Sequence, residues 1–181
     1  AIVLIFSANI SAQQNAYDFL RLDTSPRAAA LAGSFVANYD DPNVIFYNPA
    51  GINSLKESPI SFSFLKHLLD INSASVAFSK DFEGIGRFGA GVQYINYGSF
   101  TGADADGNKT GDFGAGDLAL TVGYANMLDA NTFYGVNVKF IYSGIEDRSS
   151  TGIAFDLGLQ YLIPESKWSF GFSVINLGTQ I

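Results

Sequence analysis

An acidic stretch near the middle of the chain comes closest to a metal-binding pattern. Its oxygen-bearing side chains are those of Asp104, Asp106, Asn108 and Asp112. An EF-hand loop needs Gly at its sixth position and Glu at its twelfth, whereas a loop beginning here has Gly107 at its fourth and Ala115 at its twelfth. We therefore predict an external turn rich in Gly and Asx residues, with weak contact to an ion or a partner protein as the alternative.

Other catalytic and metal-binding patterns fail at the level of residue types. The chain has no Cys, which excludes disulfides and thiolate metal sites, and its single histidine, His67, argues against a His-based zinc site or a catalytic triad. Lys139 and Asp156 fall on neighbouring predicted strands and face the same way, so we expect an ion pair. A single carboxylate cannot form a paired-carboxylate acid–base site. We predict a protein with no catalytic residues, no cofactor and no metal.

The composition points away from nucleic acid and from an ordinary soluble domain. The formal net charge is −7 and no basic cluster offsets it, which argues against nucleic-acid partners. Charged residues make up only 15% of the chain, which is low for a soluble domain. Aromatic residues and Gly are abundant, with 16 Phe, 9 Tyr and 19 Gly.

The N-terminal part divides into two segments. Residues 1–12 are apolar and then small and polar, which is typical of the back half of a secretory signal peptide cleaved after Ala12. An N-terminal strand or a piece of a transmembrane helix are the alternatives. In the segment 13–58, Ser25 and Pro26 predict the start of a short helix at about 26–32, and Gly33 would end it. Asn48–Gly51 is predicted as a turn that separates this segment from the region that follows.

From residue 59 onward large apolar and small residues alternate with the period of a β-strand. We predict seven strands, at about 59–66, 73–80, 87–96, 117–126, 133–142, 152–162 and 167–176. Ser, Gly, Ala and Thr dominate the second face, and Lys139 and Asp156 are its only mid-strand charges. A soluble sandwich would carry many charges there. The predicted fold class is therefore all-β, a transmembrane antiparallel β-barrel with a filled or narrow lumen.

The predicted connections also fit an outer-membrane barrel. Short turns follow the second, fourth and sixth strands, and we expect longer loops at 97–116 and 143–151. Aromatic residues flank all three short turns on the apolar face, as in an interfacial girdle. These residues are Phe78, Phe88, Tyr124, Tyr134, Tyr161 and Trp168. Single-chain bacterial barrels have an even strand number and open edges are costly in lipid, so seven strands predict part of a larger barrel.

Five short stretches carry a family resemblance. They are YDFL at 17–20, AAALAG at 28–33, FYNPAGI at 46–52, YINYG at 94–98 and NLGTQ at 176–180. Together they resemble the FadL-type superfamily of outer-membrane barrels, and within it the PorV/PorQ branch, whose PorQ-like members belong to the type IX secretion system. The resemblance covers residues 17–181, with a departure at Ala32, where the family pattern leads us to expect Gly.

The resemblance implies a 14-stranded barrel with an N-terminal hatch in its lumen. Residues 13–58 would form the hatch and residues 59–181 the first half of the wall. The junction between them would consist of Tyr47, Asn48, Pro49, Ala50 and Gly51. The implied location is the outer membrane of Bacteroidetes-type bacteria, in contact with lipid and lipopolysaccharide. The implied partners are other secretion and attachment components and their cargo proteins.

Three functional interpretations follow. The first is a non-enzymatic component of type IX secretion and surface attachment that binds proteins through external loops. The second is a FadL-like channel for the uptake of hydrophobic small molecules, which would require a continuous apolar path through the lumen. The third is a soluble β-sandwich.

Overall fold

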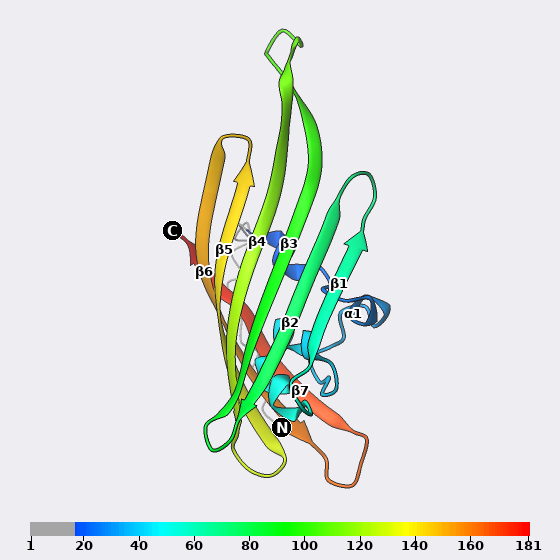
Figure 1. The fold of residues 1–181 in the computed structure, drawn as a ribbon, viewed down its shortest axis with the longest axis vertical. Helices are drawn as coiled ribbons and strands as arrows, with labels where there is room; N and C mark the ends of the chain where they lie inside the picture. The colour runs from blue at the N-terminus through cyan, green and yellow to red at the C-terminus, as the bar shows by residue number, and fades with distance from the viewer. Residues whose placement is uncertain (1–16) are drawn as a thin grey trace, which may run out of the picture.

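The structure, a computed structural model, describes residues 17–181, and the predicted signal peptide at 1–12 lies outside this range. Seven strands form one sheet that curves around an N-terminal segment (Figure 1). We call residues 17–58 the hatch segment, and we call the face of the sheet that it covers the inner face. The opposite side is the outer face.

The hatch segment contains four short helices. They are η1 (Asp18–Arg21), α1 (Pro26–Ala30), η2 (Pro42–Phe46) and η3 (Pro49–Ser54). Three of them begin with Pro, and the residue before each Pro is the N-cap. These N-cap residues are Ser25, Asp41 and Asn48, and the side chain of each accepts a hydrogen bond from a backbone N–H in the first turn. Within residues 17–181, no helix has both the length and the apolar character needed to cross a membrane.

Helix α1 begins where the sequence predicts and ends two residues earlier. The Ser25 side chain accepts a hydrogen bond of 3.1 Å from the backbone N–H of Ala28. Ala32 and Gly33 both have positive φ, at 51° and 74°. The left-handed conformation therefore begins before the glycine that we predicted as the stop, and the helix is shorter than 26–32.

The sheet is open and entirely antiparallel, which confirms the all-β prediction. Its strands are β1 (Ile60–Lys66), β2 (Asn72–Phe82), β3 (Gly86–Ala103), β4 (Lys109–Met127), β5 (Thr132–Ile145), β6 (Arg148–Leu162) and β7 (Ser169–Gln180). Each strand pairs with the next in chain order, so β1 and β7 are the edges. The strands of the described part lie in this single sheet, so residues 17–181 do not form a two-sheet sandwich.

The two predicted long loops are wrong, because most of their residues extend the strands. The chain between β3 and β4 turns over residues 104–108 only, and the chain between β5 and β6 turns over 146–147. The β3–β4 hairpin projects beyond the other strands (Figure 1). Cross-strand contacts hold it, including stacking of Phe100 on Phe113 with ring centroids 5.6 Å apart. Gly98 and Gly111 have positive φ and lie beside the two register shifts of the hairpin. In these polar, glycine-rich parts of the strands, apolar and small residues do not alternate, so the sequence pattern does not reveal a strand.

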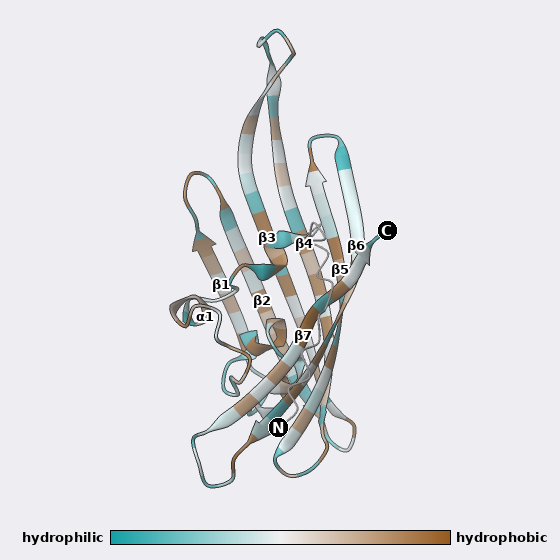
Figure 2. Cartoon of the chain, turned by 180° about the vertical axis from the view of Figure 1, so that it is seen from behind, coloured by the Kyte–Doolittle hydropathy of each residue, from teal (hydrophilic) through white to brown (hydrophobic). Residues whose placement is uncertain are grey.

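Side-chain exposure follows the predicted alternation. Val122 on β4 is 63% exposed on the outer face, whereas its neighbour Thr121 on the inner face is 2% exposed. The hydropathy colouring shows the same banding along the strands (Figure 2). Ile95 and Ile141 interrupt the small-residue pattern of the inner face. Both are buried in a cluster with Phe19 of the hatch segment, so this exception marks a contact with the hatch.

Candidate functional site

Glycines on the inner face let the hatch segment lie directly against the strands. A Cβ atom at Gly91 of β3 would lie 2.6 Å from the Phe46 ring, and one at Gly89 would lie 2.7 Å from Ile45. Both distances are shorter than packed carbon atoms allow, so a larger residue would displace the hatch. Similar close approaches occur at Gly135, Gly152, Gly158 and Gly171, which face Pro49, Tyr17, Asn48 and Val36.

Polar side chains of the inner face donate hydrogen bonds to backbone carbonyls of the hatch segment. Asn137 of β5 donates to the Ile45 carbonyl at 2.8 Å, and Ser173 of β7 donates to the Tyr47 carbonyl at 2.7 Å. Further pairs are Ser75 with Thr24, Arg87 with Glu57, Gln160 with Asn38 and Ser169 with Ala37. Except for Ile45, these carbonyls lie between or after the short helices, where no helical partner is available, and a buried unpaired carbonyl costs free energy. The inner face therefore matches this irregular backbone chemically as well as sterically.

Asn48 joins two parts of the hatch segment to the wall. It is fully buried, and its amide nitrogen donates to the Val36 carbonyl at 2.7 Å and to the Leu159 carbonyl of β6 at 3.0 Å. Its side-chain oxygen accepts from the backbone N–H of Ala50 at 3.1 Å. The turn predicted here is instead the start of helix η3, with Asn48 as its N-cap and Pro49 in the first helical position.

Gly51 is required for close packing rather than for a turn conformation. A Cβ atom there would lie 2.5 Å from the Val44 side chain and 2.9 Å from the Asn38 carbonyl. Of the five residues predicted as the junction, 47–51, three contact the later strands directly: the Tyr47 carbonyl contacts β7, Asn48 contacts β6 and Pro49 faces Gly135 of β5. Ala50 is fully buried beside them. Strand β1 begins only at Ile60.

Lys139 and Asp156 form an ion pair of 2.8 Å in which both side chains are almost completely buried. Asp156 also accepts hydrogen bonds of 2.8 Å from the Asn137 side chain and from the backbone N–H of Asn176. Lys139 donates to the Asn176 side-chain oxygen at 2.7 Å. A buried charge pair is stable only when hydrogen bonds satisfy its remaining donors and acceptors, and these contacts supply such bonds. Because Asn137 also bonds Ile45, the ion pair is connected to the hatch.

Asn176 lies at an irregularity of the sheet that the ion pair explains. The register between β6 and β7 shifts between Phe155 and Leu157, opposite Asn176, and Asn176 has a φ of +60°. This bulge directs the Asn176 backbone N–H at the Asp156 carboxylate. The hydrogen bond to the Asp156 carboxylate therefore stabilises the left-handed conformation of Asn176, and Asn176 in turn helps to bury this carboxylate.

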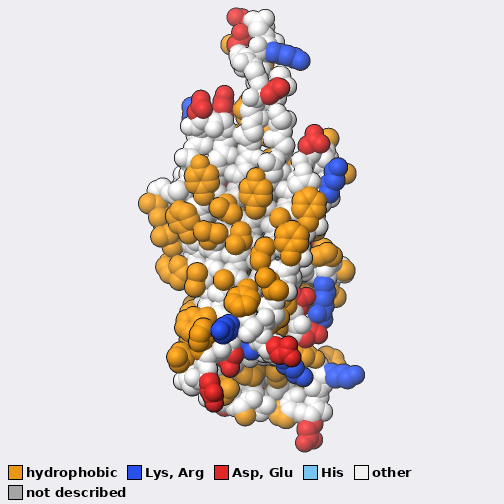
Figure 3. Space-filling model, in the orientation of Figure 1, with side chains coloured by type: hydrophobic (Ala, Val, Ile, Leu, Met, Phe, Trp, Pro, Cys, Tyr) orange, Lys and Arg blue, Asp and Glu red, His pale blue; other side chains and the backbone are white. Residues whose placement is uncertain are grey.

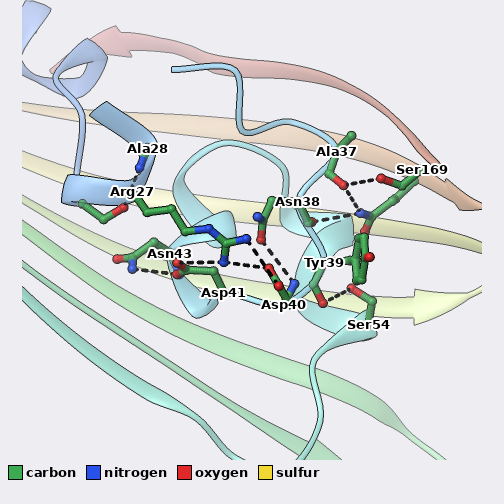
Figure 4. A network of polar contacts seen from close by, with 12 residues as sticks. Arg27, Ala28, Ala37, Asn38, Tyr39, Asp40, Asp41, Asn43, Ser54 and Ser169 are labelled. Atoms are coloured by element: carbon green, nitrogen blue, oxygen red, sulfur yellow. Dashed lines mark hydrogen bonds and ion pairs between the residues drawn. The ribbon is translucent and has the colours of Figure 1, made fainter. Parts of the chain in front are cut away.

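A second polar network lies on the exposed side of the hatch segment (Figure 4). Arg27 pairs with Asp40 at 2.8 Å and lies 3.7 Å from Asp41. Its guanidinium carbon also lies 5.8 Å from the centre of the Phe35 ring. The Arg27 side chain is about half exposed, so the pair with Asp40 orders the segment but contributes little to stability.

The acidic stretch forms the tip of the β3–β4 hairpin, and its side chains serve the turn itself. Asp104 accepts hydrogen bonds from the backbone N–H groups of Asp106 and Asn108 and from the Asn108 side chain. These bonds, the Asn108 side chain first, lower the pKa of Asp104 below its ordinary value. Asp112 lies apart on β4 and accepts from Thr101. Across residues 17–181, no three His, Cys, Asp or Glu side chains are grouped to hold a metal ion.

The outer face carries a row of aromatic side chains beside the short turns. Phe82, Phe88, Tyr124 and Tyr134 follow one another across β2 to β5, with ring centroids 5.5, 5.2 and 6.4 Å apart. The Tyr124 hydroxyl donates to the Ile85 carbonyl of the β2–β3 turn at 2.8 Å. Figure 3 shows apolar side chains gathered over the middle of this face and charged side chains toward its two ends.

The inner-face side-chain amides that bind the hatch carbonyls were not predicted from the sequence. Asn137 and Gln160 stood out as the larger polar residues among Gly, Ala and Ser, but alternation assigns a side chain to a face without naming its partner. Asn176 was also missed, because only the bulge brings it to Asp156. A comparison with protein-family models found no match, and a comparison with curated protein sequences found none either.

Proposed function

We propose that this chain forms part of the wall and the inner hatch of an outer-membrane β-barrel, and that the protein is a non-enzymatic component of type IX secretion and surface attachment. The outer face supports the membrane location, because it combines apolar side chains with a row of aromatic residues beside the short turns. The partners that we propose are other secretion and attachment components and their cargo proteins. The family resemblance of residues 17–181 is the basis for the choice of this machinery.

The observation that carries the proposal is the close match between the hatch segment and the inner face. Glycines make room for the hatch and wall side chains bond its carbonyls. Because the hatch occupies the lumen of such a barrel, we expect partners to bind at its outer end rather than to pass through it. A hollow between Phe19, Leu22 and Tyr94 measures only about 20 Å³. This volume suits about one water molecule, so this hollow does not accommodate a hydrophobic small molecule.

Deletion of the gene, with quantitative detection of surface-exposed cargo proteins, tests this function. We expect cargo to be lost from the cell surface while fatty-acid uptake stays normal. Unchanged cargo display together with lost uptake would reverse the assignment in favour of the channel. The matched control is complementation with the native gene, which should restore display.

A further inference from the structure

The outer part of the β3–β4 hairpin leaves the sheet as a two-stranded ribbon. Pairing between β2 and β3 ends at Asn96, and pairing between β4 and β5 begins at Ala115. Beyond these points the two strands pair only with each other among the described residues. Apart from the Gly114 carbonyl, which accepts from the Glu146 N–H, their outward-directed N–H and C=O groups are therefore available to another strand.

The free edge of β4 lines a hollow at the end of β5. Residues 110–114 form one wall of the hollow, and Glu146 and Asp147 of the β5–β6 turn form the other. Its volume is about 380 Å³. The backbone N–H of Glu146 donates to the Gly114 carbonyl at 3.1 Å and closes its base. The hollow thus occupies the place that β5 would take if that strand continued alongside β4.

The charges around the hollow favour one kind of occupant. Acidic residues here and at the hairpin tip are Asp104, Asp106, Asp112, Glu146 and Asp147, whereas the basic ones are Lys109 and Arg148. Stacking of Phe100 on Phe113 stiffens the ribbon, so little order has to be gained on binding. An extended segment with basic side chains would match both the unpaired backbone and the surrounding charge.

We propose that residues 110–114 are a docking site for an extended, basic segment of a partner protein, which adds to the edge of β4 as a strand. The proposal deepens the proposed function and rests on it, because the ribbon must face the outside of the cell to meet secreted partners. Backbone pairing would supply affinity, and Asp112, Glu146 and Asp147 would select basic side chains.

The probe is a ten-residue peptide of alternating valine and lysine, labelled for fluorescence anisotropy and titrated against the full protein in detergent micelles. We expect saturable binding. A peptide methylated on alternate backbone nitrogens, and a peptide with glutamate in place of lysine, should each bind about tenfold more weakly or worse. The variant Glu146→Lys with Asp147→Lys should lose binding to a similar degree. The matched control, Asp81→Lys with Glu83→Lys at the opposite end of the sheet, should bind normally.

Three results would overturn the docking site. They are absence of binding to the native protein, equal binding of the methylated peptide, and normal binding by the Glu146→Lys, Asp147→Lys variant. The cargo-display assay separates this failure from failure of the proposed function. Peptide binding with unchanged cargo display in the deletion strain would keep the site and remove the secretion role. Lost cargo display without peptide binding would do the reverse.

Discussion

At the scale of single residues, the residue types of the inner face match the hatch backbone that lies against them. Its glycines lie where the hatch segment approaches most closely, and its amides and hydroxyls lie where hatch carbonyls need donors. Small, weakly polar residues on one face of a strand therefore do not indicate a water-filled lumen here. They are the contact surface of an irregular segment.

Replacement of Gly91 by Val should loosen the hatch. The new side chain would overlap the Phe46 ring, and overpacking of this kind lowers the free energy of unfolding by about 1–3 kcal/mol. Guanidinium unfolding in detergent measures the change, and trypsin cleavage at Arg27 and Lys56 should accelerate in parallel. Gly114→Val is the matched control, because a Cβ at Gly114 has its nearest neighbour at 3.8 Å. Equal effects of the two substitutions would contradict close packing at Gly91.

Loss of the Asp156 carboxylate should be more damaging than loss of the whole ion pair. Asp156→Ala leaves the Lys139 charge buried without a partner, which costs about 3–5 kcal/mol. The double variant Lys139→Met with Asp156→Asn removes both charges and keeps one acceptor oxygen, which can serve either the Asn176 N–H or the Asn137 amide, so it should recover part of the lost stability. Unfolding free energies of the native protein and the two variants test this. A double variant as unstable as Asp156→Ala would argue against the network.

The turn at the hairpin tip should weaken in acid. The Asp104 pKa is lower in the folded protein than its ordinary value, so the ionised carboxylate stabilises the turn at neutral pH. That contribution begins to fall near the ordinary pKa, about 4, and is lost as the pH drops through the lowered folded value. NMR titration of the Asp104 carboxyl measures the shift. In Asn108→Ala the pKa should rise toward the ordinary value, and an unchanged pKa would exclude Asn108 as the main cause.

At the scale of elements, strand existence was predictable and strand length was not. Alternation identified all seven strands, because one face of each packs on the hatch and the other carries large apolar residues. It missed the outer parts of β3 and β4, where neither face is buried and cross-strand contacts such as Thr101 with Asp112 hold the pair. The bulge at Asn176 depends on a charge from another strand, so no local pattern predicts it.

The outer face of β4 offers a test of the membrane location. Val122 lies where β4 pairs with both β3 and β5, and it is 63% exposed. If lipid covers this face, Val122→Lys should destabilise the protein by at least about 1 kcal/mol and by up to about 4 kcal/mol, whereas a water-covered position would tolerate it within about 0.5 kcal/mol. Heat-modifiable mobility after folding into lipid vesicles gives the readout. Ser99→Lys, on the exposed ribbon, is the control and should fold normally.

At the scale of the whole molecule, the curved sheet and the hatch segment form one packed unit. The hatch contacts the inner face from β1 to β7, with Asn43 bonded to Ser61 at one edge and the Tyr47 carbonyl bonded to Ser173 at the other. We propose that lipid covers the outer face while the hatch, rather than water, covers the inner face.

A scan of single spin-labelled cysteines along β5, from residue 134 to 142, tests this claim most directly. Residues 1–181 contain no Cys, so within them each label reports one position. In lipid vesicles, labels at 134, 136, 138, 140 and 142 should be relaxed by oxygen and protected from a water-soluble nickel complex. A label at 141 should be protected from both reagents, because the hatch covers this position. Gly135, Asn137 and Lys139 stay unlabelled, because they contact the hatch or form the ion pair. Access of the nickel complex to the first set would contradict the membrane location, and its access to the label at 141 would contradict the filled lumen.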